Sequence, residues 1–169
     1  MSLASNNNLD CHAALAGQEI IRTTKTRWNK GKEEETKASD VENLATKALG
    51  VLQENGVYAV LLYLYSRSES EQHLAKPIRI QLLELTRLLK LSPPIGTKEK
   101  PVDAKAEQAL KFLTDDICAD LDCLLLVKQL WEQTLIYARY GAKARGIEDK
   151  MAEDAKKAKT EAEKAKSQP

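Results

Sequence analysis

The chain has 169 residues, of which 43% are hydrophobic and 30% charged, and its formal net charge is +1. This length suits a single domain with a real core, and the lack of any run of eighteen apolar residues excludes a membrane-spanning helix. Three cysteines without paired spacing (Cys11, Cys118 and Cys123) favour a reducing compartment over a disulfide scaffold. The first ten residues lack the basic and apolar regions of a secretion signal, so we expect a cytoplasmic protein.

The first predicted helix runs from about Asp10, an N-cap candidate, to near Trp28. Residues 29–38 contain Asn29, Gly31 and a run of Lys and Glu, and they are predicted to form an exposed loop. No segment of the chain alternates with a period of two, so nothing in the pattern supports β-structure. The expected fold class is therefore all-α, a compact bundle of about five to six helices.

The second and third helices are predicted to form a helical hairpin. Ser39-x-x-Glu42 has the spacing of a capping box, which predicts a helix start there. Apolar residues recur every three or four positions over 41–52 and again from 57 to about 68. Asn55-Gly56 lies between these two segments. Glycine adopts the left-handed backbone that ends helices, so the chain is expected to turn back at this point.

The fourth helix is predicted to carry Pro77 in its first turn, where the missing N–H costs nothing. It should end at Ser92, because the residue before a proline is pushed out of helical geometry. Residues 92–102 follow as a loop. The apolar residues that this helix is expected to bury are Ile78, Leu82, Leu85, Leu88 and Leu89.

Asp103 is predicted to cap a fifth helix, and Thr114-Asp115-Asp116 to form the junction with a last helix that ends near Arg145. Gly141 is a candidate interruption of that helix. Gly146 is the expected edge of the domain. The predicted division is a flexible N-terminus (1–9), a single helical-bundle domain (10–146) and a tail (147–169) rich in Ala, Lys and Glu. The tail has no apolar face to bury, which predicts a solvated helix or disorder.

The residues that chemistry requires are scarce, so we expect no catalytic residue, no metal site and no cofactor. His12 and His73 are predicted to be surface residues. The acidic block is the one enzyme-like feature, since Asp116 and Asp120 would share a helix face, as Mg²⁺ ligands do. Together with Asp115 they leave open an all-α Mg²⁺-dependent enzyme. The favoured interpretation places these aspartates at a helix N-terminus or against a basic partner.

Basic residues suggest a second kind of partner, a phosphate chain. On an ideal helix, Lys76, Arg79, Arg87 and Lys90 would fall within a sector of about 80° opposite the apolar face. A rigid row of cations of this kind contacts phosphates without reading sequence. The region from 124 to 145 is also basic. The predicted RNA-binding residues are Lys76, Arg79, Arg87, Lys90, Lys128, Arg139, Lys143 and Arg145.

Two segments resemble the small helical subunit of type III-B CRISPR RNA-guided effector complexes. Asn55-Gly56-Val57 opens a leucine-rich helix that ends at Ser66-Arg67-Ser68-Glu69, as an Asn-Gly-Leu turn does in that family. The segment 132–140 (EQTLIYARY), followed by two alanines, is similar to the family's final helix. Val57 in place of the usual leucine, Gly141 and the tail depart from the family pattern.

The resemblance implies a non-catalytic subunit that stacks head-to-tail with copies of itself beside other CRISPR effector subunits. Its partners would be guide RNA and target RNA. A head-to-tail contact joins two different surfaces. We expect the subunit contact to involve Asp115, Asp116, Asp120 and Trp131. The alternatives left open are the Mg²⁺-dependent enzyme and a helical protein–protein adaptor.

Overall fold

The computed structural model describes residues 8–29, 32–93 and 104–166, and it confirms a mostly helical, compact bundle. The predictions for the extreme N-terminus, most of the 92–102 loop and Asp103 lie outside the described residues. The helices, in chain order, are α1 (Leu9–Thr23), α2 (Ala38–Tyr65), α3 (Gln72–Leu85), α4 (Ala106–Phe112) and α5 (Leu121–Lys166). Shorter turns of helix are η1 (Glu69–Glu71), η2 (Thr86–Leu89) and η3 (Leu113–Ile117).

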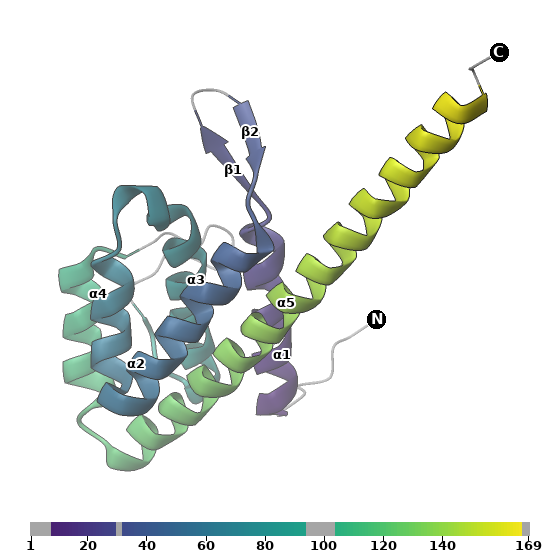
Figure 1. The fold of residues 1–169 in the computed structure, drawn as a ribbon. Coiled ribbons are helices and arrows are strands. Elements are labelled where there is room, and N and C mark those ends of the chain that lie inside the picture. The colour runs from purple at the N-terminus through teal and green to yellow at the C-terminus, as the bar shows by residue number, and fades with distance from the viewer. Residues whose placement is uncertain (1–7, 30–31, 94–103, 167–169) are drawn as a thin grey trace, which may run out of the picture.

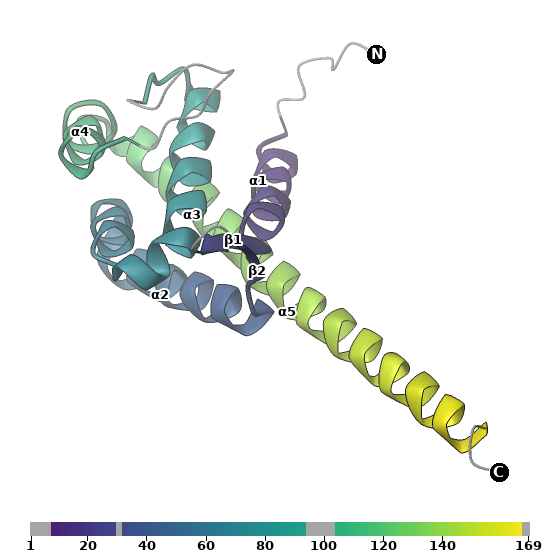
Figure 2. The same cartoon turned by 90° about the horizontal axis from the view of Figure 1, so that it is seen from above.

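The helices α1, α2 and α3 gather around the first part of α5, and the end of α5 projects from the body as a single helix (Figure 1 and Figure 2). The core lies between α5 and these helices. Its largest fully buried side chains include Trp131, Ile20 and Leu61. No helix among the described residues combines the length and the apolarity that crossing a bilayer requires.

A small β-hairpin between α1 and α2 corrects two predictions, the first helix up to Trp28 and the loop over 29–38. Strand β1 (Thr26–Asn29) pairs antiparallel with β2 (Lys32–Glu35). Arg27 lies opposite Glu34, and its Nη2 donates to Oε2 of Glu34 at 2.7 Å. The strand β2 is Lys-Glu-Glu-Glu and buries no face, so the apolar alternation that would have predicted it does not exist.

The start of α1 also differs from the prediction, because the N-cap is Asn8 and not Asp10. The Asn8 Oδ1 accepts hydrogen bonds from the backbone N–H groups of Asp10 (3.1 Å) and Cys11 (3.2 Å). At the other end, the Thr24 hydroxyl donates to the Ile20 carbonyl at 2.7 Å and helps to close the helix. The helix therefore ends before the strand begins.

The predicted break at Asn55-Gly56 is confirmed. Gly56 has φ 87° and ψ −173°, which is not helical, and it divides α2 into two arms. In Figure 1 the arm before Gly56 descends and the arm after it rises, so the chain turns back here. The predicted capping box is wrong, however. The helix begins at Ala38 after Lys37, so Ser39 already lies inside its first turn.

The start of α3 precedes the predicted one, so Pro77 lies inside the helix and not in its first turn. The helix is followed by the 3-10 turn η2, and the chain leaves it at Lys90, whose φ is 62°. A 3-10 turn has three residues per turn, which rotates the apolar face relative to an α-helix. Leu88 is consequently 38% exposed, although the α-helical spacing predicted that it is buried.

The junction before α5 lies later than predicted. Asp115 and Asp116 belong to the π-helical turn η3, and α5 begins after Asp120. The Asp120 Oδ1 accepts the backbone N–H of Cys123 at 3.0 Å, so this aspartate is the helix cap. The interpretation of an acidic residue at a helix N-terminus is thus confirmed for Asp120.

Two glycines predicted to interrupt or end α5 lie inside an unbroken helix. A Cβ at Gly141 would meet Cγ1 of Ile21 at 3.1 Å, and a Cβ at Gly146 would meet Cβ of Ala38 at 3.3 Å. They allow α1 and the start of α2 to approach α5 closely. Beyond Gly146, residues 147–161 form an exposed helix, the solvated alternative predicted for the tail.

Helices α1 and α5 approach each other closely at Gly17. An added Cβ there would lie 2.9 Å from Cβ of Tyr137 and 3.2 Å from the backbone nitrogen of Ala138, so the helices must separate. We expect Gly17→Ala to destabilise the fold by about 1–3 kcal/mol. The matched control is Gly50→Ala in α2, where a Cβ meets nothing within 4 Å. It should stabilise the protein by about 0.5–1 kcal/mol, through helix propensity. Urea unfolding of both variants checks this, and equal effects would contradict it.

Candidate nucleic-acid interface

The structure separates the eight predicted RNA-binding residues into three groups: buried, scattered and aligned. Arg79 is buried at 3% exposure. Its Nη1 donates to the carbonyl of Leu64 at 3.2 Å and to Oε1 of Gln72 at 2.8 Å, and the guanidinium lies 4.3 Å from the ring centroid of Tyr65. Arg79 therefore ties α3 to the end of α2. Its predicted place on an outer basic ridge is wrong.

Arg145 is also buried, at 8% exposure. Its Nη2 donates to the carbonyl of Thr36, and its Nε lies 3.5 Å from Oδ2 of Asp149 one turn along α5. The residue thus fixes the end of the hairpin against α5. The prediction of a phosphate-binding surface residue at this position is wrong, because the side chain is buried between the end of the hairpin and α5.

The rest of the predicted ridge is scattered. Lys76 is exposed on α3, whereas Arg87 lies on η2 with its Nε 2.7 Å from Oε2 of Glu84. Lys90 is exposed, but it lies past the end of η2 with a left-handed backbone. Because α3 does not continue as an α-helix to residue 90, the four residues cannot share the sector that an ideal helix predicted.

Lys128, Arg139 and Lys143 lie along one side of α5. At 100° per residue they lie within a sector of about 60°, and Lys150 falls in the same sector. We call these four residues the basic edge. Lys150 lies beyond Gly146, the predicted edge of the domain, so the sequence prediction does not include it. The unbroken helix carries the row about 33 Å along its axis.

The basic edge lies beside α2. Glu132 falls in the same sector of α5, and its Oε1 accepts a hydrogen bond from Nε2 of Gln53 in α2 at 2.6 Å. Gly146, nearer the other end, approaches Ala38 at the start of α2. The arm of α2 before Gly56 therefore runs antiparallel to α5, and the basic edge lies along the line where this arm meets α5.

The cations of the basic edge have unused bonding capacity. Within the described ranges, none of the four takes part in a salt bridge. Lys143 and Lys150 are exposed, while Lys128 and Arg139 are half-buried. The Arg139 guanidinium lies 5.5 Å from the ring centroid of Tyr140, and its buried Nε finds no acceptor in the described structure. A phosphate oxygen is the acceptor that such a guanidinium binds well.

The acidic residues predicted for a subunit contact are exposed, whereas Trp131 is not. Asp115 accepts a hydrogen bond from Nζ of Lys111 at 2.6 Å. That bond, followed by one from the Thr114 hydroxyl, holds the pKa of Asp115 below its usual value. Asp116 and Asp120 lie on different elements and do not form the helical pair expected for Mg²⁺. Trp131 is fully buried, so its predicted subunit contact is wrong.

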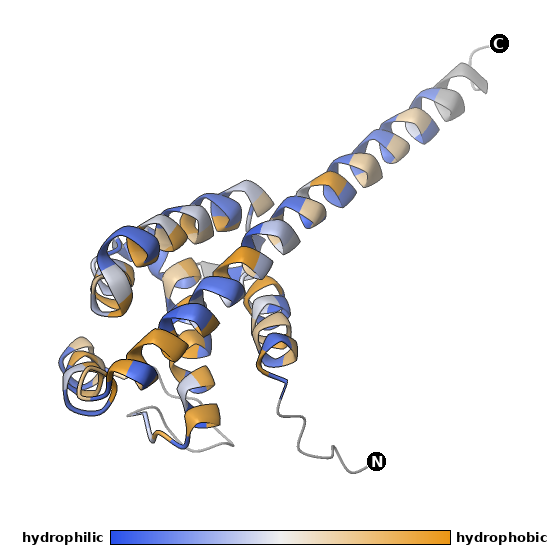
Figure 3. Cartoon of the chain, turned by 90° about the horizontal axis from the view of Figure 1, so that it is seen from below, coloured by the Kyte–Doolittle hydropathy of each residue, from blue (hydrophilic) through white to orange (hydrophobic). Residues whose placement is uncertain are grey.

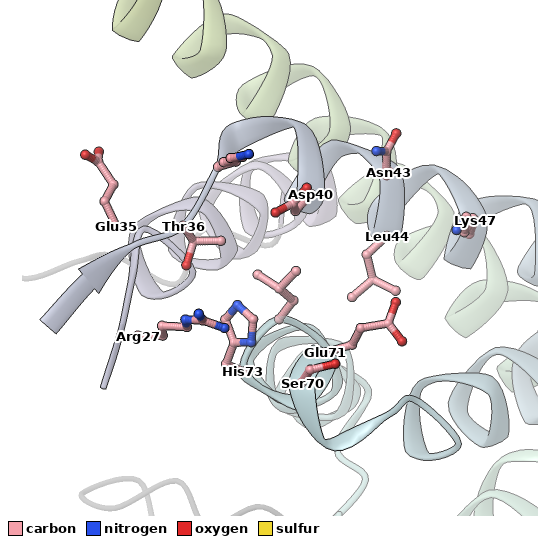
Figure 4. Close-up of a pocket in the computed structure, with 12 residues that line it drawn as sticks. Arg27, Glu35, Thr36, Asp40, Asn43, Leu44, Lys47, Ser70, Glu71 and His73 are labelled. Carbon is pink, nitrogen blue, oxygen red and sulfur yellow. The ribbon is translucent and has the colours of Figure 1, made fainter. Parts of the chain in front are cut away.

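A polar pocket of about 370 Å³ lies between the hairpin, the start of α2 and the start of α3 (Figure 4). Figure 4 shows Arg27 and His73 on one side of it and Lys47 on the other. The lining also includes the acids Glu35 and Asp40, so no single charge dominates. Among the described residues, no group of three or more His, Cys, Asp or Glu is arranged to hold a metal ion.

Comparisons with protein-family models, with curated proteins and with solved structures gave no match to this chain.

Proposed function

We propose that this protein is a non-catalytic, RNA-binding small subunit of a type III CRISPR effector complex, which binds guide and target RNA through the basic edge of α5. The observation that carries the RNA-binding proposal is the alignment of Lys128, Arg139, Lys143 and Lys150 on one side of a rigid helix, without acidic partners in the described structure. Cations aligned in this way neutralise phosphates and do not distinguish base sequence.

The resemblance to the type III-B small subunit supplies the biological setting. The glycine break at residue 56 and the final helix, which carried that resemblance, are both present as structural elements. The exposed acids of η3 lie near the start of α5 and the basic edge runs toward its other end. Different surfaces of opposite charge are what a head-to-tail stack of copies requires.

The test compares two variants that lose the same charge. Lys128→Gln, Arg139→Gln, Lys143→Gln removes three cations of the basic edge. The control, Lys25→Gln, Lys32→Gln, Lys105→Gln, removes three exposed lysines that lie elsewhere. Lys25 follows α1, Lys32 lies in the hairpin, and Lys105 precedes α4. Binding is measured by fluorescence anisotropy on several unrelated single-stranded RNAs.

We expect the basic-edge variant to bind about 10- to 100-fold more weakly on every RNA, because three phosphate contacts are lost. The control should change affinity by no more than about 3-fold, because it lowers only the long-range electrostatic attraction between the protein and RNA. Equal losses in the two variants would mean that net charge, and not the basic edge, determines binding. Loss on one RNA sequence alone would also contradict the proposal.

A further inference from the structure

An apolar stripe with largely exposed side chains begins at Tyr140, beside α1, and continues along the projecting part of α5. Figure 3 shows apolar residues recurring among hydrophilic ones along this part of the helix. Tyr140, Ile147 and Met151 are 58%, 55% and 68% exposed. With 100° per residue they share a sector of about 80° with three exposed alanines. The members of this apolar stripe are Tyr140, Ala144, Ile147, Met151, Ala155 and Ala158.

We propose that the apolar stripe binds the same stripe on a second copy of this chain, with the two helices antiparallel. The argument for a second copy is the charge of the helix itself. Residues 148–154 contain four acids and one base, whereas residues 155–161 contain three bases and one acid. An antiparallel pair places the acidic half of each helix against the basic half of the other. A parallel pair would place like against like.

The side chains fit the same arrangement when the pair is centred between residues 154 and 155. Met151 of one copy then lies opposite Ala158 of the other, so a large side chain meets a small one. Glu148 and Lys159 flank the stripe on the same side, and antiparallel packing brings the same flank of both helices together. Glu148 of each copy then lies about two residues, or about 3 Å along the axis, from the position opposite Lys159 of the other copy, so the dimer contains two Glu148–Lys159 pairs. In Figure 2 the end of α5 projects away from the body, so an antiparallel pair of these ends places the two bodies at opposite ends of the pair.

The first test is the mass of the full chain by analytical ultracentrifugation. An interface of this size belongs to the weak class, so we expect a monomer at about 1 µM and a dimer by about 500 µM. Ile147→Asp, Met151→Asp should remain monomeric throughout. The control, Ala152→Asp, Thr160→Asp, adds the same charge outside the stripe and should still dimerise. All of these positions are exposed, so folding is expected to be unaffected.

The second test concerns the orientation. Glu148→Lys and Lys159→Glu should each weaken the dimer about 3- to 10-fold, and the double variant should recover most of the loss. A chain that stays monomeric, a dimer that survives the stripe variant, or a double variant without recovery would overturn the proposal. RNA binding of the stripe variant is compared with that of the Ala152→Asp, Thr160→Asp control, which carries the same added charge. We expect equal RNA affinities in these two variants and different masses, so this result is separate from that of the basic edge.

Discussion

Trp131→Ala is expected to lower the free energy of unfolding by about 3–5 kcal/mol. Trp131 is fully buried in the core on α5, and truncation leaves a large cavity that the surrounding helices fill only in part. Chemical denaturation followed by far-UV circular dichroism measures the loss directly. A residue of a subunit contact would behave differently, because its truncation would weaken assembly and leave the isolated chain equally stable.

The matched control is Trp131→Phe, which keeps an aromatic ring at the same position. The indole Nε1 of Trp131 has no hydrogen-bond partner in the described structure, so phenylalanine removes volume without breaking a hydrogen bond. We expect a smaller loss of about 1–2 kcal/mol. An alanine variant as stable as the parent chain would show that this side chain is not part of the core.

Arg79→Met is expected to destabilise the protein by about 2–4 kcal/mol, although it replaces a charged residue with one of similar length. The change leaves the Leu64 carbonyl and the Gln72 Oε1 without the donor they have now, and it removes the cation from the Tyr65 ring. The loss should appear in the same denaturation measurement. RNA affinity of the folded variant should be that of the parent chain, since Arg79 is buried.

Lys76→Met provides the control, because Lys76 lies on the same helix and is exposed. A surface substitution of this kind should change stability by less than about 0.5 kcal/mol. If Arg79→Met proved as mild as Lys76→Met while RNA binding collapsed, Arg79 would belong to the interface after all.

The features predicted well from the sequence are those with a local cause. The break at Gly56 follows from the one residue that adopts positive φ at no cost, so Asn55-Gly56 could be read directly. The helical class follows from apolar residues repeated every three or four positions. The observed ends of helices differ from the predicted ones where a different residue forms the cap. The N-cap of α1, for example, is Asn8 and not the predicted Asp10.

The features that could not be predicted depend on contacts between distant segments. Helix propensity alone suggests that α5 is interrupted at Gly141 and Gly146. In the structure these two glycines, which lack a side chain, let Ile21 and Ala38 pack closely against α5. The strands β1 and β2 are held by backbone pairing and by Arg27 and Glu34, not by an apolar face. Neither the glycine contacts of α5 nor the pairing of β1 with β2 leaves a periodic pattern of apolar residues in the sequence.

The candidate site shows the same division. The sequence predicted Lys128, Arg139 and Lys143 only as basic residues of one helical region, and the structure shows that they share one side of α5, because an unbroken α-helix fixes the angles between them. The prediction failed for Arg79 and Arg145, whose charges are bound by carbonyl groups of Leu64 and Thr36. A long cationic side chain can be buried against backbone carbonyl groups inside a fold, and sequence alone does not show which arginines are.

The salt dependence of RNA affinity tests the central claim most directly. The logarithm of the binding constant should fall with the logarithm of salt concentration by about 0.7 for each phosphate contacted. The parent chain should therefore show a slope of about −3, and the basic-edge variant one that is shallower by about 2. Parallel lines for the two proteins, or affinity that is independent of salt, would contradict phosphate binding by the basic edge.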